Sequence, residues 1–301
     1  MFEKILVPLD GTPEAAVALP PARAIATLTG GKLTLLRIVP PPLANDKELL
    51  RAETYLARVA DELESEAPQT ATMVRAGNAA EEILKEVDEQ GADLVVMATH
   101  GRTGLGRAII GSVTQQVLAK SSVPVLLLRP GGHRLTRIET ILVPVDGTPG
   151  GALALGAALG LTRLAGAKLV LLEVAIPIPV SVYGGLDGAF YVDPSWDDEA
   201  LSSAQSYVDG LAEKLRRIGI AAEGRAVLGQ VTSTIVRTAD DVSANLIVMS
   251  THALTGPART ILGSVADGVV RGGHRPVLLV RRGAHQRLSA AGPWLAASAT
   301  T

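Results

Sequence analysis

The sequence contains no cysteine and very few aromatic residues, which make up 3% of its 301 residues. Without cysteine the chain can form no disulfide bond, no thiolate nucleophile and no cysteine-ligated zinc site. Hydrophobic residues nevertheless make up 47% of the chain, so its core must be built from Val, Leu, Ile and Ala. An aliphatic core of this kind favours layered helices and buried sheet.

The sequence also lacks a strong net charge and long apolar runs. Its formal net charge is −2, whereas a nucleic-acid-binding protein would carry a basic domain or stripe. No run reaches the roughly 18 apolar residues that a membrane-spanning helix needs. The opening "MFEKILVPLD" is typical of a strand rather than of a signal peptide. We therefore expect a cytoplasmic protein with no nucleic acid and no membrane among its partners.

The chain is a tandem repeat. "ILVPLDGTP" at 5–13 recurs as "ILVPVDGTP" 136 residues later, whereas "DLVVMATH" at 93–100 recurs as "NLIVMSTH" 152 residues later. The change of spacing indicates an insertion of 16 residues after the second strand of the second copy. We predict a first domain at 1–131, a second domain at 137–284 and a loose C-terminal tail at 285–301.

The insertion, at 176–196, is rich in aromatic residues for this chain. It holds two of the four tyrosines and one of the two tryptophans. Three roles remain open for it: a lid over a ligand site, a contact in an oligomer, or a flexible loop. Its aromatic content favours the first two, because disordered segments are poor in aromatic residues.

Each copy alternates between two kinds of segment. Short apolar runs such as "KILVPL" and "DLVVMA" predict strands that are buried on both faces. Amphipathic segments between them predict helices, at 13–29, 45–67, 78–90 and from about 111 to 120 in the first copy. Strands that alternate with helices imply a parallel sheet. We predict an α/β fold with two tandem doubly wound domains, each an open five-stranded, mostly parallel sheet with helices on both faces.

A glycine-rich stretch follows the fourth strand of the first copy. "MATHGRTGLGRAIIGSV" at 97–113 has four glycines, two arginines and a Gly-Ser pair where a helix is predicted to begin. Glycines let the backbone approach a phosphate and adopt positive φ angles, and the free N–H groups at a helix start favour an anion. The hydroxyl of Ser112 could both cap the helix and donate to a phosphate. The stretch indicates phosphate binding, and the alternative is a plain capped loop.

Two sharper phosphate motifs do not fit this stretch. Gly106 and Gly111 have the spacing of a P-loop, but Ser112 follows where that motif requires Lys. Gly104-x-Gly106 lacks the third glycine of a dinucleotide fingerprint and follows the wrong strand. Because the charge used in γ-phosphate transfer is missing, we predict no catalytic residue and at most weak ATP hydrolysis.

These features together resemble the universal stress protein family over nearly the whole chain. The resemblance rests on "ILVPLDGTP", on the glycine stretch and on the closing "GSVTQQVLAKSSVPVLLLRP". ATP-binding members carry Gly-x2-Gly-x9-Gly-Ser/Thr in this loop. The first copy has Ala98, Gly101 and Gly111 at the three glycine positions, whereas the second copy keeps only the last of them. The resemblance therefore implies ATP binding in which the first site is more intact than the second.

The resemblance also implies which residues form each ATP site. In the first copy they are Pro8, Leu9, Asp10, Val39, Met97, Ala98, Gly101, Arg102, Gly111, Ser112 and Val113. In the second copy, which we expect to bind more weakly, they are Pro144, Val145, Asp146, Val174, Met249, Ser250, Ala253, Gly263, Ser264 and Val265. Any Mg²⁺ would be held through the ATP phosphates, and we predict no metal ligand in the protein itself.

The function that the resemblance implies is that of a nucleotide-dependent sensor or signalling module in a stress response. Family members often pair through their last strand, which is 123–129 in the first copy and 275–281 in the second. Apolar edge strands of this kind usually need a partner. We therefore expect a pseudo-twofold arrangement of the domains and a homodimer through the last-strand edges. A scaffold that binds no nucleotide, and a weak ATPase, remain the alternative functions.

Overall fold

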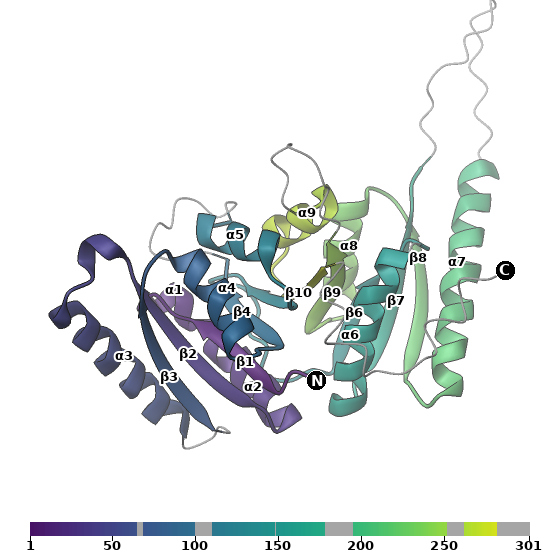
Figure 1. The fold of residues 1–301 in the computed structure, drawn as a ribbon. Helices are drawn as coiled ribbons and strands as arrows, with labels where there is room; N and C mark the ends of the chain where they lie inside the picture. Colours follow the sequence, from purple (N-terminus) through teal and green to yellow (C-terminus); the bar gives the residue numbers. More distant parts are fainter. Residues whose placement is uncertain (65–68, 100–109, 148, 178–194, 252–261, 282–301) are drawn as a thin grey trace, which may run out of the picture.

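The computed structural model describes residues 1–64, 69–99, 110–147, 149–177, 195–251 and 262–281. Within these ranges the strands form one continuous ten-stranded sheet that runs through the whole molecule (Figure 1). Most of the insertion predicted at 176–196, and the whole of the tail predicted at 285–301, lie outside the described residues.

The strand order is symmetric about the middle of the sheet, as β3-β2-β1-β4-β5-β10-β9-β6-β7-β8. The first half supplies β1 (Lys4–Pro8), β2 (Lys32–Val39), β3 (Thr70–Ala76), β4 (Leu94–Ala98) and β5 (Val125–Leu128). The second half supplies β6 (Thr140–Pro144), β7 (Lys168–Ala175), β8 (Ala222–Leu228), β9 (Leu246–Thr251) and β10 (Val277–Arg281). Neighbours within each half are parallel, as predicted.

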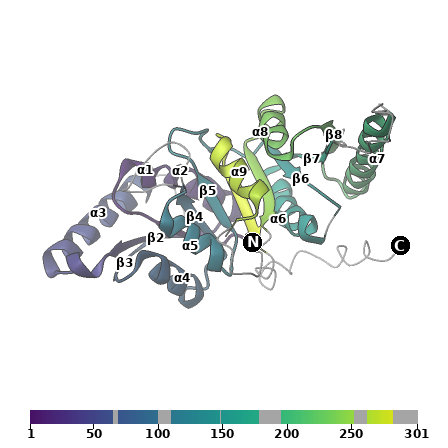
Figure 2. The same cartoon turned by 90° about the horizontal axis from the view of Figure 1, so that it is seen from above.

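Helices cover both faces of this sheet (Figure 2). In the first half they are α1 (Pro13–Ala16), α2 (Leu19–Thr29), α3 (Asp46–Glu64), α4 (Ala79–Glu89) and α5 (Ser112–Lys120), with a short 3-10 helix at Pro41–Leu43. In the second half they are α6 (Pro149–Ala165), α7 (Ser195–Arg217), α8 (Val231–Asp241) and α9 (Ser264–Gly272). Among the described helices, none combines the length and apolar composition that crossing a membrane requires.

The sheet separates two aliphatic cores, and each core continues through both halves. One core joins α2, α3, α6 and α7 to the sheet, and the other joins α4, α5, α8 and α9 to its opposite face. Because helices cover both faces, a central strand such as β4 is buried at every position. That burial explains why its sequence is a continuous apolar run rather than an alternating one.

The segment 13–29 forms two helices, although the sequence predicted a single one. The chain turns at Val17 and Ala18, and α2 begins directly afterwards with Pro20 and Pro21 in its first turn. Proline has no N–H to donate to the preceding turn, but it fits the first turn of a new helix. The proline pair therefore ends α1 and starts α2.

The last strands of the two halves pair with each other at the centre of the sheet. Leu126 of β5 lies opposite Leu278 of β10 in antiparallel register. The homodimer predicted through these edges is therefore wrong, because each edge is already occupied by the other within one chain. This pairing covers both apolar edges and relates the two halves by a pseudo-twofold axis.

Two matched arginines make reciprocal contacts across this seam. Nη1 of Arg129 donates to the carbonyl oxygens of Arg271 (3.0 Å) and Gly273 (2.9 Å) at the end of α9. Arg281, which lies 152 residues later, donates through Nη1 to the carbonyl oxygen of Ala119 near the end of α5. The last carbonyls of a helix lack intrahelical partners and carry partial negative charge. Each domain therefore caps a helix of the other.

Candidate functional site

The carboxyl ends of three strands meet the start of a helix in each half. These elements are β1, β2, β4 and α5 in the first half, and β6, β7, β9 and α9 in the second. The amide of Gly111 donates to the carbonyl of Thr99 (2.8 Å), and the hydroxyl of Thr114 donates to the carbonyl of Ala98 (3.2 Å). These bonds fix the start of α5 at the end of β4. The strand order reverses here, which is where open α/β sheets bind ligands.

A cavity of about 490 Å³ lies at this edge of the second half. Its lining includes the predicted residues Pro144, Val145, Asp146, Val174, Met249, Ser250, Gly263, Ser264 and Val265. The remaining predicted residue of that half, Ala253, lies outside the described residues. Pockets for small molecules commonly measure about 300–1,000 Å³, so the cavity has the size of a ligand site.

The cavity also contains residues that the sequence interpretation missed. These are Leu172, Glu173, Ile176, Val231, Ile235 and Ala266. Val231 and Ile235 lie one helical turn apart at the start of α8, and this apolar i, i+4 spacing was the available signal. They add apolar residues of α8 to a lining that also includes the polar start of α9.

In the first half the predicted residues occupy the matched elements. Those in the described part of the chain are Pro8, Leu9 and Asp10 at the end of β1, Met97 and Ala98 at the end of β4, and Gly111, Ser112 and Val113 at the start of α5. Gly101 and Arg102 lie outside the described residues. Val39 ends β2, but the repeat partner of the cavity residue Val174 is Ile38. Ile38 is therefore a first-half residue that the prediction omitted.

Each candidate phosphate-binding helix starts at a glycine. Gly111 and Gly263 are the N-cap residues, and neither helix has a side-chain cap hydrogen bond. Ser112 is the first residue of α5 and is exposed, so the prediction that its hydroxyl caps the helix is wrong. The two glycines have φ angles of −60° and −46°, so neither is needed for a positive φ. The helix starts leave amide groups available for an acceptor.

Asp10 organises the turn after β1. Its Oδ1 atom accepts hydrogen bonds from the amide (3.0 Å) and the hydroxyl (2.6 Å) of Thr12. The hydroxyl oxygen of Thr12 in turn accepts from the amide of Ala15 and caps α1. Gly11 has a φ of +83°, and its repeat partner Gly147 has a φ of +70°. The resemblance implied a place for Asp10 in the ATP site, and the structure shows that its carboxylate also holds this turn.

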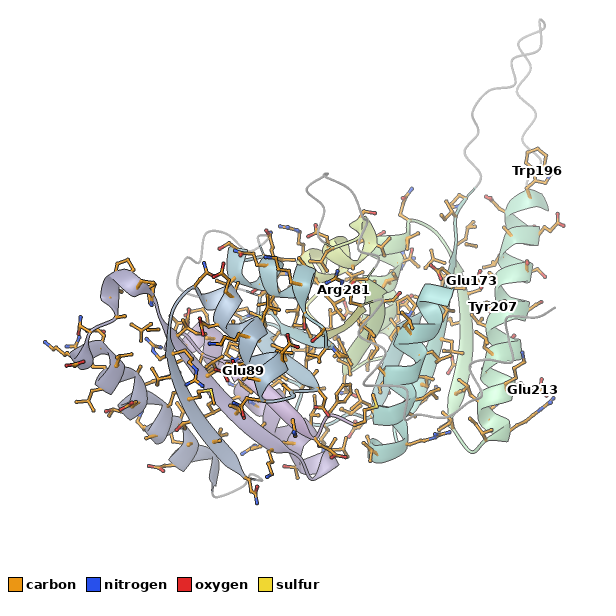
Figure 3. All side chains as sticks on the ribbon, in the orientation of Figure 1. Glu89, Glu173, Trp196, Tyr207, Glu213 and Arg281 are labelled. Carbon is orange, nitrogen blue, oxygen red and sulfur yellow. The ribbon has the colours of Figure 1, made fainter. Side chains whose placement is uncertain are left out.

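Carboxylate groups give the second-half site a distinct electrostatic character. Burial raises the pKa of Glu173, and the nearby charge of Asp146 raises it further. Burial also raises the pKa of Tyr207 on α7, and Glu173 and Asp146 add to that shift. Figure 3 shows Glu173 on β7 and Tyr207 on the adjacent α7. Oε2 of Glu173 is buried and has no hydrogen-bond partner, so this corner of the site disfavours further negative charge.

The described residues contain no group of three or more His, Asp or Glu side chains that could hold a metal ion.

Comparison with known proteins gives one family for both halves. The model of the universal stress protein family matches residues 1–129 and 137–281. A universal stress protein from Thermus aquaticus is 32% identical over 137 residues, which are 43% of this chain and 100% of that protein. A universal stress protein from Mycolicibacterium smegmatis is 24% identical over 296 residues, which are 92% of this chain and 96% of that protein.

A solved structure agrees with this assignment at the level of the fold. The universal stress protein from Archaeoglobus fulgidus has a TM-score of 0.71 at 20% sequence identity, over 93% of this chain and 96% of that chain. The fold predicted from the sequence is therefore confirmed across the two halves. Because the family model covers both halves in tandem, the chain belongs to the universal stress protein family.

Proposed function

We propose that this protein binds ATP and acts as a nucleotide-dependent sensor or signalling module in a stress response. The observation that carries the proposal is the cavity at the edge of the second half. Its lining combines apolar residues of β7 and α8 with the uncapped start of α9. Apolar walls suit a base, and free N–H groups at a helix start suit phosphates.

The first half supports the same proposal through its matched elements. It keeps the Gly-Ser start of α5, and its loop has glycine at position 101 where the second loop has Ala253. Alanine restricts the close approach of backbone to phosphate that glycine permits. We therefore expect the first half to bind ATP more tightly than the second, with any Mg²⁺ held through the phosphates.

Sensing or signalling is favoured over catalysis by the residues at the start of α5. Ser112 follows Gly111 where a P-loop carries Lys, so the positive charge that assists γ-phosphate transfer is missing. We assign no catalytic residue to either half. Phosphate release by the purified protein at a rate clearly above a protein-free blank would replace this reading with a weak ATPase.

Matched tryptophan variants test the proposal in the two halves. Ser112 and Ser264 are exposed first residues of α5 and α9, so Ser112→Trp and Ser264→Trp fill the space before the helix without entering the core. Calorimetric titration of the wild type with ATP should show a tighter and a weaker site. Ser112→Trp should remove the tighter site, and Ser264→Trp should remove the weaker one. Wild-type binding by both variants would refute the proposal.

The nucleotide carried by the protein from its host cell provides an independent measurement. Freshly purified protein is denatured, and the released small molecules are separated by chromatography and identified by mass. ATP in the extract would support the proposal. An extract without adenine nucleotide, together with no heat of ATP binding, would favour a scaffold that works through partner contacts.

A further inference from the structure

A separate cavity lies in the first half between the end of β2 and the start of α3. It measures about 230 Å³, and its lining includes Gly11, Arg37, Val39, Glu48, Arg51 and Tyr55. Val39 and Ile38 line it and are also assigned to the first ATP site, but none of its residues belongs to the glycine stretch at 97–113 or to α5, where the triphosphate is proposed to lie. Gly11 and Val39 nevertheless bring it close to the end of β1 and β2, where a nucleoside would lie.

Arg37 is the central polar group of this cavity. Its Nη1 atom is buried and makes no hydrogen bond, although a buried donor without an acceptor costs about 1–3 kcal/mol. The turn at Gly11 closes against the guanidinium, since a Cβ added at Gly11 would lie 2.2 Å from Nη1. The guanidinium carbon also lies 5.3 Å from the centre of the Tyr55 ring. The arginine is thus held in place without an acceptor for one of its donors.

The other arginines around Tyr55 are neutralised by carboxylates. Arg51 pairs with Glu48, and Arg58 lies 3.9 Å from Glu62. Among the described residues, no carboxylate forms an ion pair with Arg37. The Arg37 side chain as a whole is half-buried, and its buried Nη1 end is the part for which the described residues supply no acceptor.

We propose that this cavity is an anion-binding site in which Arg37 binds a phosphate or carboxylate group. A guanidinium offers two parallel N–H donors that match the oxygens of such a group. Arg51 and its ion-pair partner Glu48 both line the cavity, so the positive charge that no ion pair balances in the lining is that of Arg37. Tyr55 also lines the cavity, and burial raises the pKa of its hydroxyl above the ordinary value.

The second half has the opposite charge at the matched position. Glu173 stands where the first half has Arg37, Ser203 stands where it has Arg51, and Tyr207 matches Tyr55. Oε2 of Glu173 is also buried without a hydrogen-bond partner. A carboxylate beside Asp146 repels an anion, so the anion site belongs to the first half alone.

The anion could come from two sources that share the same chemistry. It could be a free ion, or it could be a phosphate carried on the ribose of a nucleotide bound next to the cavity. Titration with inorganic phosphate alone detects the first source. Comparison of AMP with adenosine 3′,5′-bisphosphate detects the second, because the two ligands differ only in the ribose phosphate. The phosphate arm needs no nucleotide, so its outcome does not depend on the proposed ATP sites.

The test compares the full-length wild type with Arg37→Gln by calorimetry in a phosphate-free buffer of low ionic strength. Arg37→Gln should weaken binding of phosphate, or the preference for the bisphosphate over AMP, by about tenfold or more. Arg37→Lys keeps the charge but not the two parallel donors and should show an intermediate loss. Arg58→Gln is the matched control, because Arg58 also lies over the Tyr55 ring, at 5.9 Å, but does not line the cavity.

Circular dichroism and thermal unfolding establish that each variant is folded before it is titrated. Loss in Arg37→Gln with wild-type affinity in Arg58→Gln supports the site. The site is overturned if wild type and Arg37→Gln bind phosphate equally and show the same preference between AMP and the bisphosphate. An equal loss in Arg37→Gln and Arg58→Gln also overturns it, because general loss of positive charge would then explain the effect.

Discussion

The two halves of this chain have the same fold but opposite charges at one matched position. Arg37 of β2 and Glu173 of β7 are 136 residues apart in the repeat. Each has a tyrosine of the covering helix as a neighbour, Tyr55 or Tyr207. Each also has one buried side-chain atom without a hydrogen-bond partner. The two halves therefore share the packing of this corner but carry opposite charges there.

This difference separates what the fold requires from what a ligand requires. Packing alone would favour an apolar residue at a position where a polar atom is buried and unsatisfied, since that atom costs about 1–3 kcal/mol. The first half has such an unsatisfied atom in Arg37, and the second half has one at the matched position, in Glu173. Perturbed and unsatisfied groups cluster at functional sites, so this position is consistent with the ligand site proposed at Arg37.

The edge strands of the two halves differ in how closely a helix approaches them. Gly224 of β8 corresponds to Thr72 of β3. A Cβ added at Gly224 would lie 2.6 Å from the carbonyl carbon of Val208 in α7. The side chain of Gln205, also in α7, donates to the carbonyl of Gly224 (3.2 Å) and accepts from the amide of Ala226 (2.8 Å). The helix is thus bonded directly to the backbone of its edge strand.

Gly224→Ala should have the largest effect on stability. The added methyl meets backbone atoms of α7, which cannot move aside as a flexible side chain can, so we expect destabilisation by about 1–3 kcal/mol. Thr72→Ala is the matched control in the first half, where the residue is exposed, and it should change stability by less than about 0.5 kcal/mol. Urea unfolding followed by circular dichroism measures both. Equal destabilisation would show that the helices approach the two edge strands alike.

Substitution of the reciprocal arginines at the seam should cause the next largest loss of stability. Arg129→Ala leaves two carbonyls of the α9 end without a charged donor, so we expect a loss of about 1–2 kcal/mol. Arg281→Ala removes the contact with Ala119 and should cost less than Arg129→Ala. Thermal unfolding of both variants shows which of them loses more stability. A larger loss in Arg281→Ala than in Arg129→Ala would contradict the contacts described for the seam.

Much of the fold followed from the repeat and from the apolar runs. Lys4–Pro8 and Thr140–Pro144 form matched central strands because each is a short apolar run that helices cover on both sides. The seam between β5 and β10 could not be predicted in the same way. An apolar edge indicates that a partner strand is needed, but its sequence does not say whether that partner lies in the same chain or in another.

The candidate site was predictable only where one sequence segment carries it. The strand ends near Asp146 and the helix start at Gly263 were found because each is a local motif. Glu173, Val231 and Ile235 reach the same cavity from different elements, and only the packing of α8 against β7 brings them together. The charge reversal at Arg37 and Glu173 can be read from the aligned repeats, but the cavity beside each residue was found only in the structure.

Glu173 allows a smaller and pH-dependent test of the difference between the halves. Burial first, and then the charge of Asp146, raises the pKa of Glu173 in the folded protein. The folded state therefore binds this proton more tightly than the unfolded state. At a pH above the pKa of Glu173 in the folded protein, the ionised carboxylate lowers the free energy of unfolding. This loss disappears as the pH falls through that pKa. Solvent screens the partly exposed carboxylate. We therefore expect a smaller change in stability from substituting Glu173 than from substituting Gly224 or the seam arginines.

Glu173→Gln should be more stable than the wild type at neutral pH, and the difference should shrink as the pH is lowered. Glu213 provides a control of opposite sign, because its hydrogen bond with Arg217 lowers the pKa of Glu213. Glu213→Gln should therefore lose stability at neutral pH and approach the wild type in acid. Urea unfolding across a pH series measures both variants. A Glu173→Gln protein less stable than the wild type at neutral pH would show that the carboxylate is compensated there, and the contrast with Arg37 would fail.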